Sequence, residues 1–430
     1  MTRAEESLER LLATRADGEP GFLAAHRAEG AATFRRLKLP TTRHEDWRFT
    51  SLAGLSQLEL RRALPAGMPA AADLPPAPRI VFVNGRHDPA LSDLAGLPAG
   101  AVVQSLADAL ARTPELVEPW LGRRAPTSDH PFAGLNAALF EDGAFVVLPE
   151  GARAERPIHL VHLASGAAGA AMHPRHVIVA APGARAEIAE LYEGDDGAYL
   201  VNALTEVYAA PGAEIAHYRL QREGAGAFHV GLLEVEQGRA SRFRGHSLAV
   251  GAQLARVESR ALLAAEQADC ALEGLYLANG TQLHDHLVLV DHASPHTTSR
   301  ELFKGVLDDK GHGVFAGRIR VRPGAQKIDA AQSSSNLLLS DDAVADAKPQ
   351  LEIDADDVKC SHGGTVGQLD PNALFYLRSR GVDELTARAL LTYAFAAELV
   401  ERMGPADLRD RVRRLVASRL AGGAALLEAA

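Results

Sequence analysis

A thiol and an imidazole stand close together near the C-terminal end of this sequence, and both could bind a metal. Cys360 is one of only two cysteines, and His362 follows two residues later. In an extended strand, side chains two residues apart point to the same face. Thiolate sulfur and imidazole nitrogen are both ligands for iron, zinc and other first-row metals.

These two residues alone fall short of a complete metal site. A closed zinc or iron–sulfur site usually has four protein ligands, so Cys360 and His362 would need others from a second subunit. We therefore expect no permanently bound cofactor in the isolated chain. The alternative is structural: a small buried cysteine beside a hydrogen-bonded histidine at the end of a sheet.

Three more histidines form a second candidate metal site. His284, His286 and His292 lie in one run of the sequence, and clustered imidazoles can bind first-row metals. The first two share a strand face and resemble the His-x-His pattern of cupins, but the glutamate expected shortly after that pattern is missing. A β-solenoid or cupin-like metalloenzyme is therefore kept as an alternative function, against a polar strand face without a catalytic role.

The segment after His362 predicts a helix with defined ends. Asp370 can cap it, Pro371 suits its first position, and Gly381 can end it in the left-handed conformation. Arg378 and Arg380 fall in the last turn, where cations interact favourably with the helix dipole. Such a helix, next to the candidate metal site, could dock a partner protein.

Composition limits the kinds of ligand and compartment. The 430 residues are 47% hydrophobic and carry a net charge of −10, which disfavours nucleic acid as a main ligand. No Gly-Lys pair occurs, so a phosphate-binding loop of the Walker type is absent. Two cysteines do not make a disulfide framework, and no apolar run approaches the ~20 residues of a membrane span. Acidic residues stand where a signal peptide needs an apolar run, so we expect a cytoplasmic protein that binds no membrane.

A recurring turn predicts a solenoid. Pro-Gly-Ala occurs at Pro182, Pro211 and Pro323, and Pro149 begins a related turn; the first three of these four positions in chain order are 33 and 29 residues apart. Short Val-, Ile- and Leu-rich runs lie between the turns. A period of this size is typical of stacked β coils, although a β-sandwich would also combine short strands with turns.

The predicted secondary structure divides the chain into three parts. Residues 1–143 are mainly helical, 144–369 form the strand-rich core, and 370–430 are helical again. The N-terminal helix begins with Thr2 and Glu5, which can form a capping box.

Several motifs resemble those of the SufB/SufD family of the SUF iron–sulfur cluster assembly system. They are Ser299-Arg-Glu-Leu-Phe-Lys-Gly, Asn336-Leu-Leu-Leu-Ser, Val358-Lys-Cys-Ser-His-Gly and Leu374-Phe-Tyr-Leu-Arg-Ser-Arg-Gly. Weaker similarity reaches back to Glu45-Asp-Trp-Arg. The run Lys327–Asn336 lacks the cysteine that SufB-like chains carry in this region, so the chain looks like the SufD branch.

The resemblance implies a fold and a role. The fold would be mainly β, a right-handed parallel β-helix flanked by N- and C-terminal α-helical domains. The chain would be a non-enzymatic scaffold that forms a heterodimer with SufB through the β-helix, docks the SufC ATPase on its C-terminal helices and assists iron acquisition, with a homodimer as another state of the isolated chain. His362, with Cys360 beside it, would hold iron or a nascent cluster transiently at the SufB interface. The SufC-docking residues would be Leu374, Phe375, Tyr376, Leu377, Arg378 and Arg380.

Overall fold

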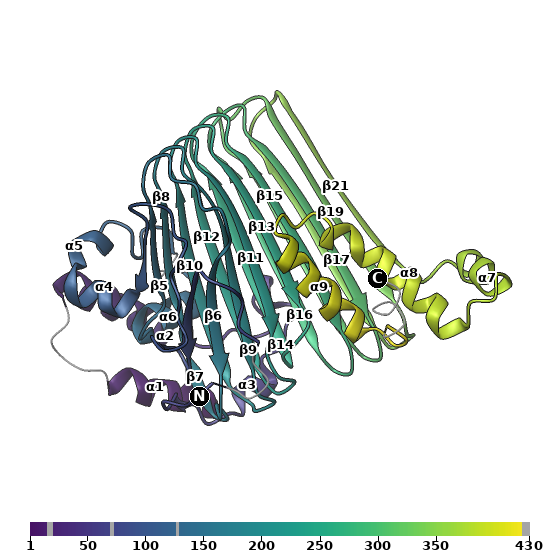
Figure 1. The fold of residues 1–430 in the computed structure, drawn as a ribbon, viewed down its shortest axis with the longest axis horizontal. Helices are drawn as coiled ribbons and strands as arrows, with labels where there is room; N and C mark the ends of the chain where they lie inside the picture. Colours follow the sequence, from purple (N-terminus) through teal and green to yellow (C-terminus); the bar gives the residue numbers. More distant parts are fainter. Residues whose placement is uncertain (15–19, 69–72, 126–128, 424–430) are drawn as a thin grey trace.

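Two long parallel sheets face each other along the whole molecule (Figure 1). The computed structural model describes residues 1–14, 20–68, 73–125 and 129–423. From Arg175 onward, successive strands alternate between the two sheets, so each strand pairs in parallel with the strand two positions further along the chain. Paired residues are 26 to 32 positions apart. This offset matches the spacing of the predicted turns, and it makes the core a parallel β-helix rather than the β-sandwich that was the alternative.

Sheet A, as we name it, contains the even-numbered strands of the core. Its strands are, in order, β20 (Val344–Ile353), β18 (His312–Val321), β16 (Leu283–His292), β14 (Leu254–Leu263), β12 (Phe228–Gln237), β10 (Leu200–Ala209), β8 (Arg175–Ala180), β5 (Ala144–Leu148) and β4 (Val102–Ser105). The short strand β7 (Ala170–Met172) also pairs with β10, and β1 (Arg61–Arg62) pairs with β7.

Sheet B contains the intervening strands. Its strands are, in order, β21 (Val358–Gly367), β19 (Ile328–Leu338), β17 (Thr298–Leu307), β15 (Asp269–Ala278), β13 (Arg242–Ala249), β11 (Glu214–Arg222), β9 (Arg185–Gly194), β6 (Ile158–Ala164), β2 (Arg79–Val83) and β3 (Arg86–His87). Strands β2 and β4 precede residue 144 in the chain, and both sheets therefore begin within the N-terminal part.

The predicted turns connect one coil to the next. Gly183 and Gly212 adopt φ angles of +67° and +69°, a conformation that glycine reaches without a steric penalty. Between the turns, alternate side chains of each strand point into the narrow space between the sheets. There Ile188, Phe243 and Phe315 belong to one buried apolar cluster that draws on both sheets.

The helices lie in the terminal parts of the chain, and several of them cover the outer faces of the two sheets. They are α1 (Arg3–Ala13), α2 (Gly21–Leu37), α3 (Ala53–Ser56), α4 (Leu106–Arg112), α5 (Pro114–Val117), α6 (Pro131–Leu139), α7 (Pro371–Ser379), α8 (Glu384–Val400) and α9 (Ala406–Arg419), with a 3₁₀ turn, η1, at Glu45–Trp47. The mainly β class and the terminal helices that the sequence predicted are thus confirmed, and so is the capping box of α1.

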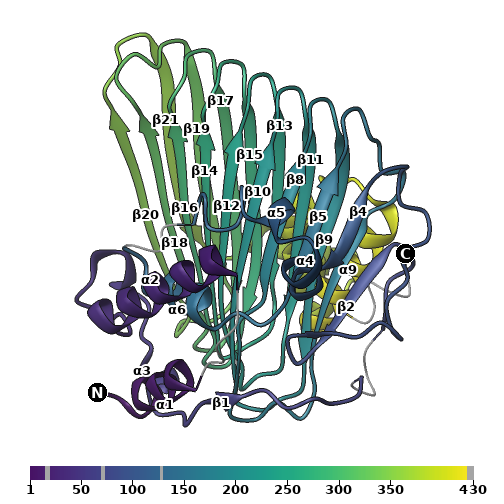
Figure 2. The ribbon, with the colours of Figure 1, turned by 90° about the vertical axis from the view of Figure 1, so that its left-hand side faces the viewer.

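Each sheet has its own helical cover. On the outer face of sheet A, Trp47 and residues of α1, α2 and α6 pack against Phe228 and Leu254 (Figure 2). On the outer face of sheet B, Leu399 of α8 and Val412 of α9 pack against apolar side chains of the middle coils (Figure 1). Lys304 of β17 reinforces this contact by donating a hydrogen bond to the carbonyl oxygen of Phe395, 2.9 Å away.

Charged side chains are also buried in the middle coils. Glu190 accepts hydrogen bonds from Arg219 at 2.9 Å and Thr205 at 2.5 Å, and its carboxylate is 2.8 Å from Nε2 of His217. Burial alone would raise the pKa of Glu190, but the positive charge of Arg219 and the hydrogen bond with His217 outweigh it and hold the pKa well below its usual range. The carboxylate therefore stays charged inside the β-helix.

We predict that Arg219→Met destabilises the protein by about 3–5 kcal/mol, because it leaves the Glu190 carboxylate buried without the guanidinium. A depressed pKa means that the stabilisation from this pair is present above the usual pKa of glutamate and is lost as pH falls. Urea denaturation of both proteins at pH 7 and at pH 4 tests this. A smaller difference is expected at pH 4, because without Arg219 burial raises the pKa of Glu190 and the variant's carboxyl can take up a proton at that pH. Arg300→Met, which removes the exposed Arg300–Asp329 pair, is the control and should cost less than about 1 kcal/mol.

Candidate functional site

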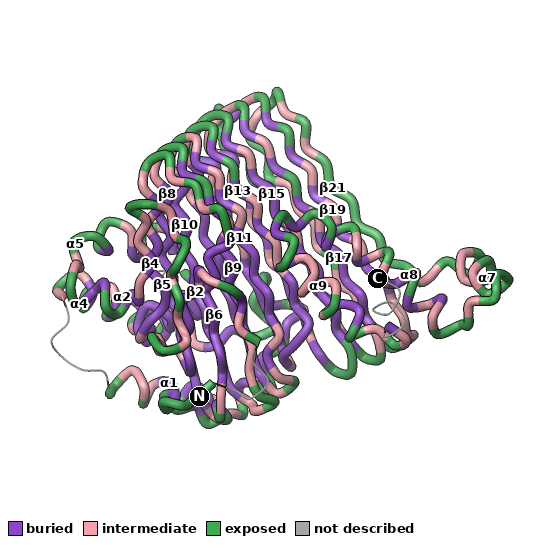
Figure 3. Tube along the Cα trace, in the orientation of Figure 1, coloured by how far each residue is buried: buried purple, intermediate pink, exposed green. Residues whose placement is uncertain are grey.

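The candidate pair lies on the last strand of the β-helix. Among the strands that the structure describes, β21 pairs only with β19, and its register places Cys360 beside Ala330 and His362 beside Gln332. Because Ala330 and Gln332 are buried between the sheets, Cys360 and His362 face the interior as well. Beyond β21 no further coil of the described chain covers them, so this inward face is uncovered. Most residues of β21 are accordingly exposed (Figure 3).

Cys360 sits at the edge of an apolar cluster. Its half-buried side chain packs with Ile319, Ala330 and Leu351, which come from three neighbouring strands. Partial burial, followed by the negative charge of Asp329, raises the pKa of the Cys360 thiol. The thiol is therefore protonated at neutral pH, and a metal or a positive partner would be needed to favour the thiolate.

His362 is the more accessible of the two. It is exposed, and it lies two residues after Cys360 on the same inward face of β21. The predicted arrangement of both side chains on one strand face is thus present in the structure. Their use as iron ligands stays a prediction.

Cys270, the other cysteine, cannot join them. It faces the same interior but lies three strands deeper, where Ser299 and Ala330 separate it from Cys360 in the register. Strands are about 4.8 Å apart, so the two sulfur atoms are separated by roughly 14 Å. Burial raises the pKa of Cys270 and keeps it a packing residue. Within the described ranges, no group of three or more His, Cys, Asp or Glu side chains could hold a metal ion.

The three histidines of the alternative hypothesis are buried and separated. His284, His286 and His292 all lie on β16, and burial lowers their pKa values to about 4, about 3 and about 4. His284 is hydrogen-bonded to the carbonyl oxygen of Gly251, and His292 to Thr297 and Ser299. Six residues of strand place His292 about 20 Å from His286, so the three cannot share one ion. The geometry favours packing histidines over a metalloenzyme site.

Helix α7 extends away from the body of the molecule (Figure 1). Asp370 accepts a hydrogen bond from the amide of Asn372 at 2.9 Å, and Gly381 adopts a φ of +87°, so both predicted helix ends are confirmed. None of its residues is buried. Phe375 and Tyr376 leave 75% and 57% of their surface exposed, which is unusual for large hydrophobic side chains.

The remaining predicted docking residues lie on the same helix or at its end. Leu374 and Leu377 are half-buried, while Arg378 and Arg380 are exposed. The guanidinium of Arg380 stacks over the Tyr376 ring at 5.2 Å. The helix therefore presents aromatic and cationic groups together.

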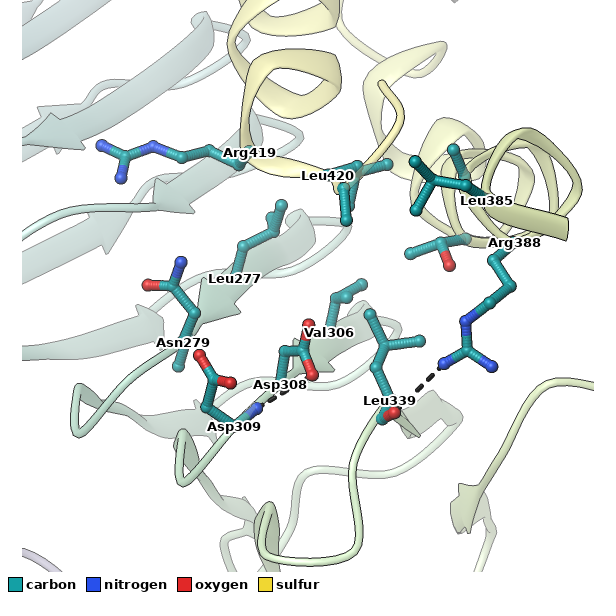
Figure 4. A pocket seen from close by; sticks show the side chains of 14 residues that line it. Leu277, Asn279, Val306, Asp308, Asp309, Leu339, Leu385, Arg388, Arg419 and Leu420 are labelled. Carbon is teal, nitrogen blue, oxygen red and sulfur yellow. Dashed lines mark hydrogen bonds between the residues drawn. The ribbon is translucent and has the colours of Figure 1, made fainter. Parts of the chain in front are cut away.

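A cavity of about 200 Å³ separates α8 from the turns of the β-helix (Figure 4). Leu277, Val306 and Leu385 give it apolar walls, and at one side of it Arg388 donates a hydrogen bond to the carbonyl oxygen of Leu339 at 3.1 Å. This contact anchors α8 to the last coils. It does not bring the cavity to Cys360 or His362, which are not among its lining residues.

Comparison with known proteins decides the family. The family model described as the SufBD core domain of SUF system FeS cluster assembly matches residues 162–395, and the SufBD N-terminal region matches residues 76–160. The chain belongs to the SufBD family. The resemblance inferred from the sequence motifs is confirmed.

Two SufBD relatives match nearly end to end. The iron–sulfur cluster assembly protein SufD of Escherichia coli is 32% identical over 397 residues, which cover 90% of this chain and 91% of the relative. An iron–sulfur cluster assembly SufBD family protein of Synechocystis is 33% identical, covering 93% of this chain and 92% of its own. Among the helices described for this SufBD chain, none combines the length and apolarity needed to cross a membrane.

We predict that only one of the two thiols reacts in the native protein. A thiol reagent such as iodoacetamide should label Cys360 in the folded protein and Cys270 only after unfolding, because the latter is 1% exposed. Labelling of Cys360 should accelerate as pH rises, since its raised pKa leaves little thiolate at pH 7. Mass spectrometry after labelling at pH 7 and pH 9 measures this. Native labelling that persists in Cys360→Ser would contradict it.

Proposed function

We propose that this SufBD chain is a non-enzymatic scaffold subunit that assembles iron–sulfur clusters at the open end of its β-helix, in a site shared with a SufB-type subunit. The observation that carries the proposal is the placement of Cys360 and His362 on the uncovered inward face of β21. A thiol and an imidazole at the end of a solenoid can meet ligands from a second protein, whereas the same residues in a middle coil could not.

The ligand count supports a shared site. Two ligands hold iron less firmly than the four of a resident cluster, and imidazole gives up iron more readily than thiolate. Such a site suits a cluster that must be transferred, and it could also take part in acquiring the iron. Iron and the cluster are then cargo of the scaffold.

The ends of both sheets offer a way to hold the second subunit. Strands β20 and β21 terminate sheets A and B, so each has one edge whose backbone groups pair with no strand described in the structure. Free edges are natural places for strand addition by a partner. A SufB-type subunit that extended both sheets would bring its own ligands to His362. Two copies of this chain could use the same edges in a homodimer.

Helix α7 is the surface proposed for an ATPase of the SufC type. Its exposed aromatic pair, Phe375 and Tyr376, resembles the buried anchors of protein interfaces, and Arg378 and Arg380 stand beside them. Because α8 and α9 pack on sheet B, a movement of the ATPase could be passed through them to the β-helix.

We predict that replacing both aromatic residues, Phe375→Ser with Tyr376→Ser, weakens SufC binding at least tenfold. The loss follows from removing the exposed aromatic anchors, while the core is untouched. Point variants test the docking surface more specifically than deletion of residues 371–430, since deletion would also uncover the apolar outer face of sheet B. Isothermal titration calorimetry with the purified ATPase measures the change. The matched control is Leu116→Ser, an exposed leucine on α5, which should leave the affinity unchanged.

We predict that His362→Ala leaves the complex with SufB and SufC intact but strongly reduces cluster formation. The complex is expected to survive because the exposed imidazole contributes little packing. Co-purification reports assembly, and anaerobic reconstitution followed by visible absorbance reports the cluster. Cys360→Ser should have a milder effect, because the cysteine also packs in the apolar cluster. Normal cluster formation by His362→Ala, or failure of the complex to form, would show that the histidine is structural.

A further inference from the structure

Two buried polar residues lie in line behind His362. The register of sheet B places Gln332 of β19 next to His362, and Glu301 of β17 next to Gln332. Glu301 and Gln332 are each 3% exposed. At about 4.8 Å per strand, this row spans about 10 Å from the open end into the core.

The amide of Gln332 is held in place from two sides. Its Nε2 donates a hydrogen bond to Oε2 of Glu301 at 2.6 Å. Across the interior it lies against Gly317 of sheet A, where an added Cβ would come within 1.7 Å of Nε2. The absence of a side chain at Gly317 therefore makes room for this amide.

The same amide has an unused acceptor. Its Oε1 is buried, and it has no hydrogen-bond partner in the part of the chain that the structure describes. A buried carbonyl oxygen without a partner is costly, typically by about 1–3 kcal/mol, so its persistence calls for a reason. The neighbour on the open side of Gln332 is His362, whose ring N–H is a donor of the right kind.

Glu301 is suited to hold this amide. Its second oxygen, Oε1, also lacks a partner in the described structure. Burial raises the pKa of Glu301 to about 8, so at neutral pH the side chain is largely a neutral acid. A neutral acid can stay buried beside the amide at much lower cost than a charged one.

We propose that Gln332, held by Glu301, is a positioning residue for His362: its Oε1 accepts the N–H of one imidazole nitrogen and so leaves the other nitrogen free to face the open end. This inference rests on the proposed function of His362. Metal-binding histidines generally donate their second ring N–H to such an acceptor, which fixes the tautomer and the ring orientation, and loss of the acceptor typically costs 10- to 100-fold in affinity or activity. The row Glu301–Gln332–His362 would supply this support from within one chain.

The test compares Gln332→Met with Glu301→Gln. Methionine has a similar length and fills the space without an acceptor, whereas glutamine at 301 keeps an oxygen that can hold the amide. Nitrogen-15 NMR of the histidine-labelled protein, with His362→Ala to assign the signal, reports the tautomer of His362. We expect one tautomer to dominate in the wild type and in Glu301→Gln, and a mixture in Gln332→Met.

Cluster yield in the reconstituted complex is the second readout. Gln332→Met should lower the yield about tenfold, with the complex intact, and Glu301→Gln should largely retain it. Ser334→Ala is the control, because this buried serine lies in the same strand beside Gly364 rather than His362. Should Gln332→Met misfold, Glu301→Met, which removes only the support for the amide, takes its place with the same expectation.

The outcomes separate the two proposals. A cluster yield that depends on His362 while the tautomer and yield are unchanged in Gln332→Met would overturn the positioning role and leave the proposed function standing. A tautomer that shifts in Gln332→Met while His362→Ala assembles clusters normally would support the contact and overturn the function on which the inference rests.

Discussion

Each coil of a β-helix can bury its inward side chains only against the coils on either side of it. In the middle of this protein, the inward side chains of every strand are covered from both sides, since each strand has a neighbour before and after it in its sheet. Strand β21 has one neighbour in its sheet, β19, within the described part of the chain. The inward residues of β21 are therefore left half-buried or exposed, even though the residues paired with them in β19 are buried. The site that we propose for cluster assembly therefore lies where the stack of coils ends.

The same stacking explains why charge is tolerated inside. Parallel strands in register bring residues of one row to within a few ångströms, so a buried carboxylate can meet its cation one coil away. Glu190 and Arg219 are paired in this way across β9 and β11. Shape is matched across the interior in a similar way. Gly317 has no side chain, and the amide of Gln332 on the facing sheet occupies the space that a Cβ would need. The residues aligned across neighbouring strands therefore determine together how charge and volume are matched in the interior.

Some of this could be predicted from the sequence. Turn spacing indicated the solenoid, and Asp370, Pro371 and Gly381 marked the ends of α7, because local backbone preferences do not depend on distant contacts. Burial of individual side chains could not be predicted. Strand β10 is buried along its whole length, since helices cover its outer face, and the alternation that usually separates inside from outside is lost there. Because burial could not be predicted, the sequence also left open whether His284 and His292 are packing residues or metal ligands. The partners of Gln332 depend on a register that only the fold defines.

The nearest-neighbour character of the stack also has a consequence for how the protein opens. A middle coil can unfold only if it gives up two interfaces, whereas the terminal coil gives up one. Local unfolding should therefore begin at β20 and β21 and proceed inwards, with amide hydrogen exchange fastest at that end. A subunit that caps the end would convert the least protected coil into an internal one. Binding and local folding would then be coupled at the same two strands, and the scaffold would become fully ordered only as part of an assembly.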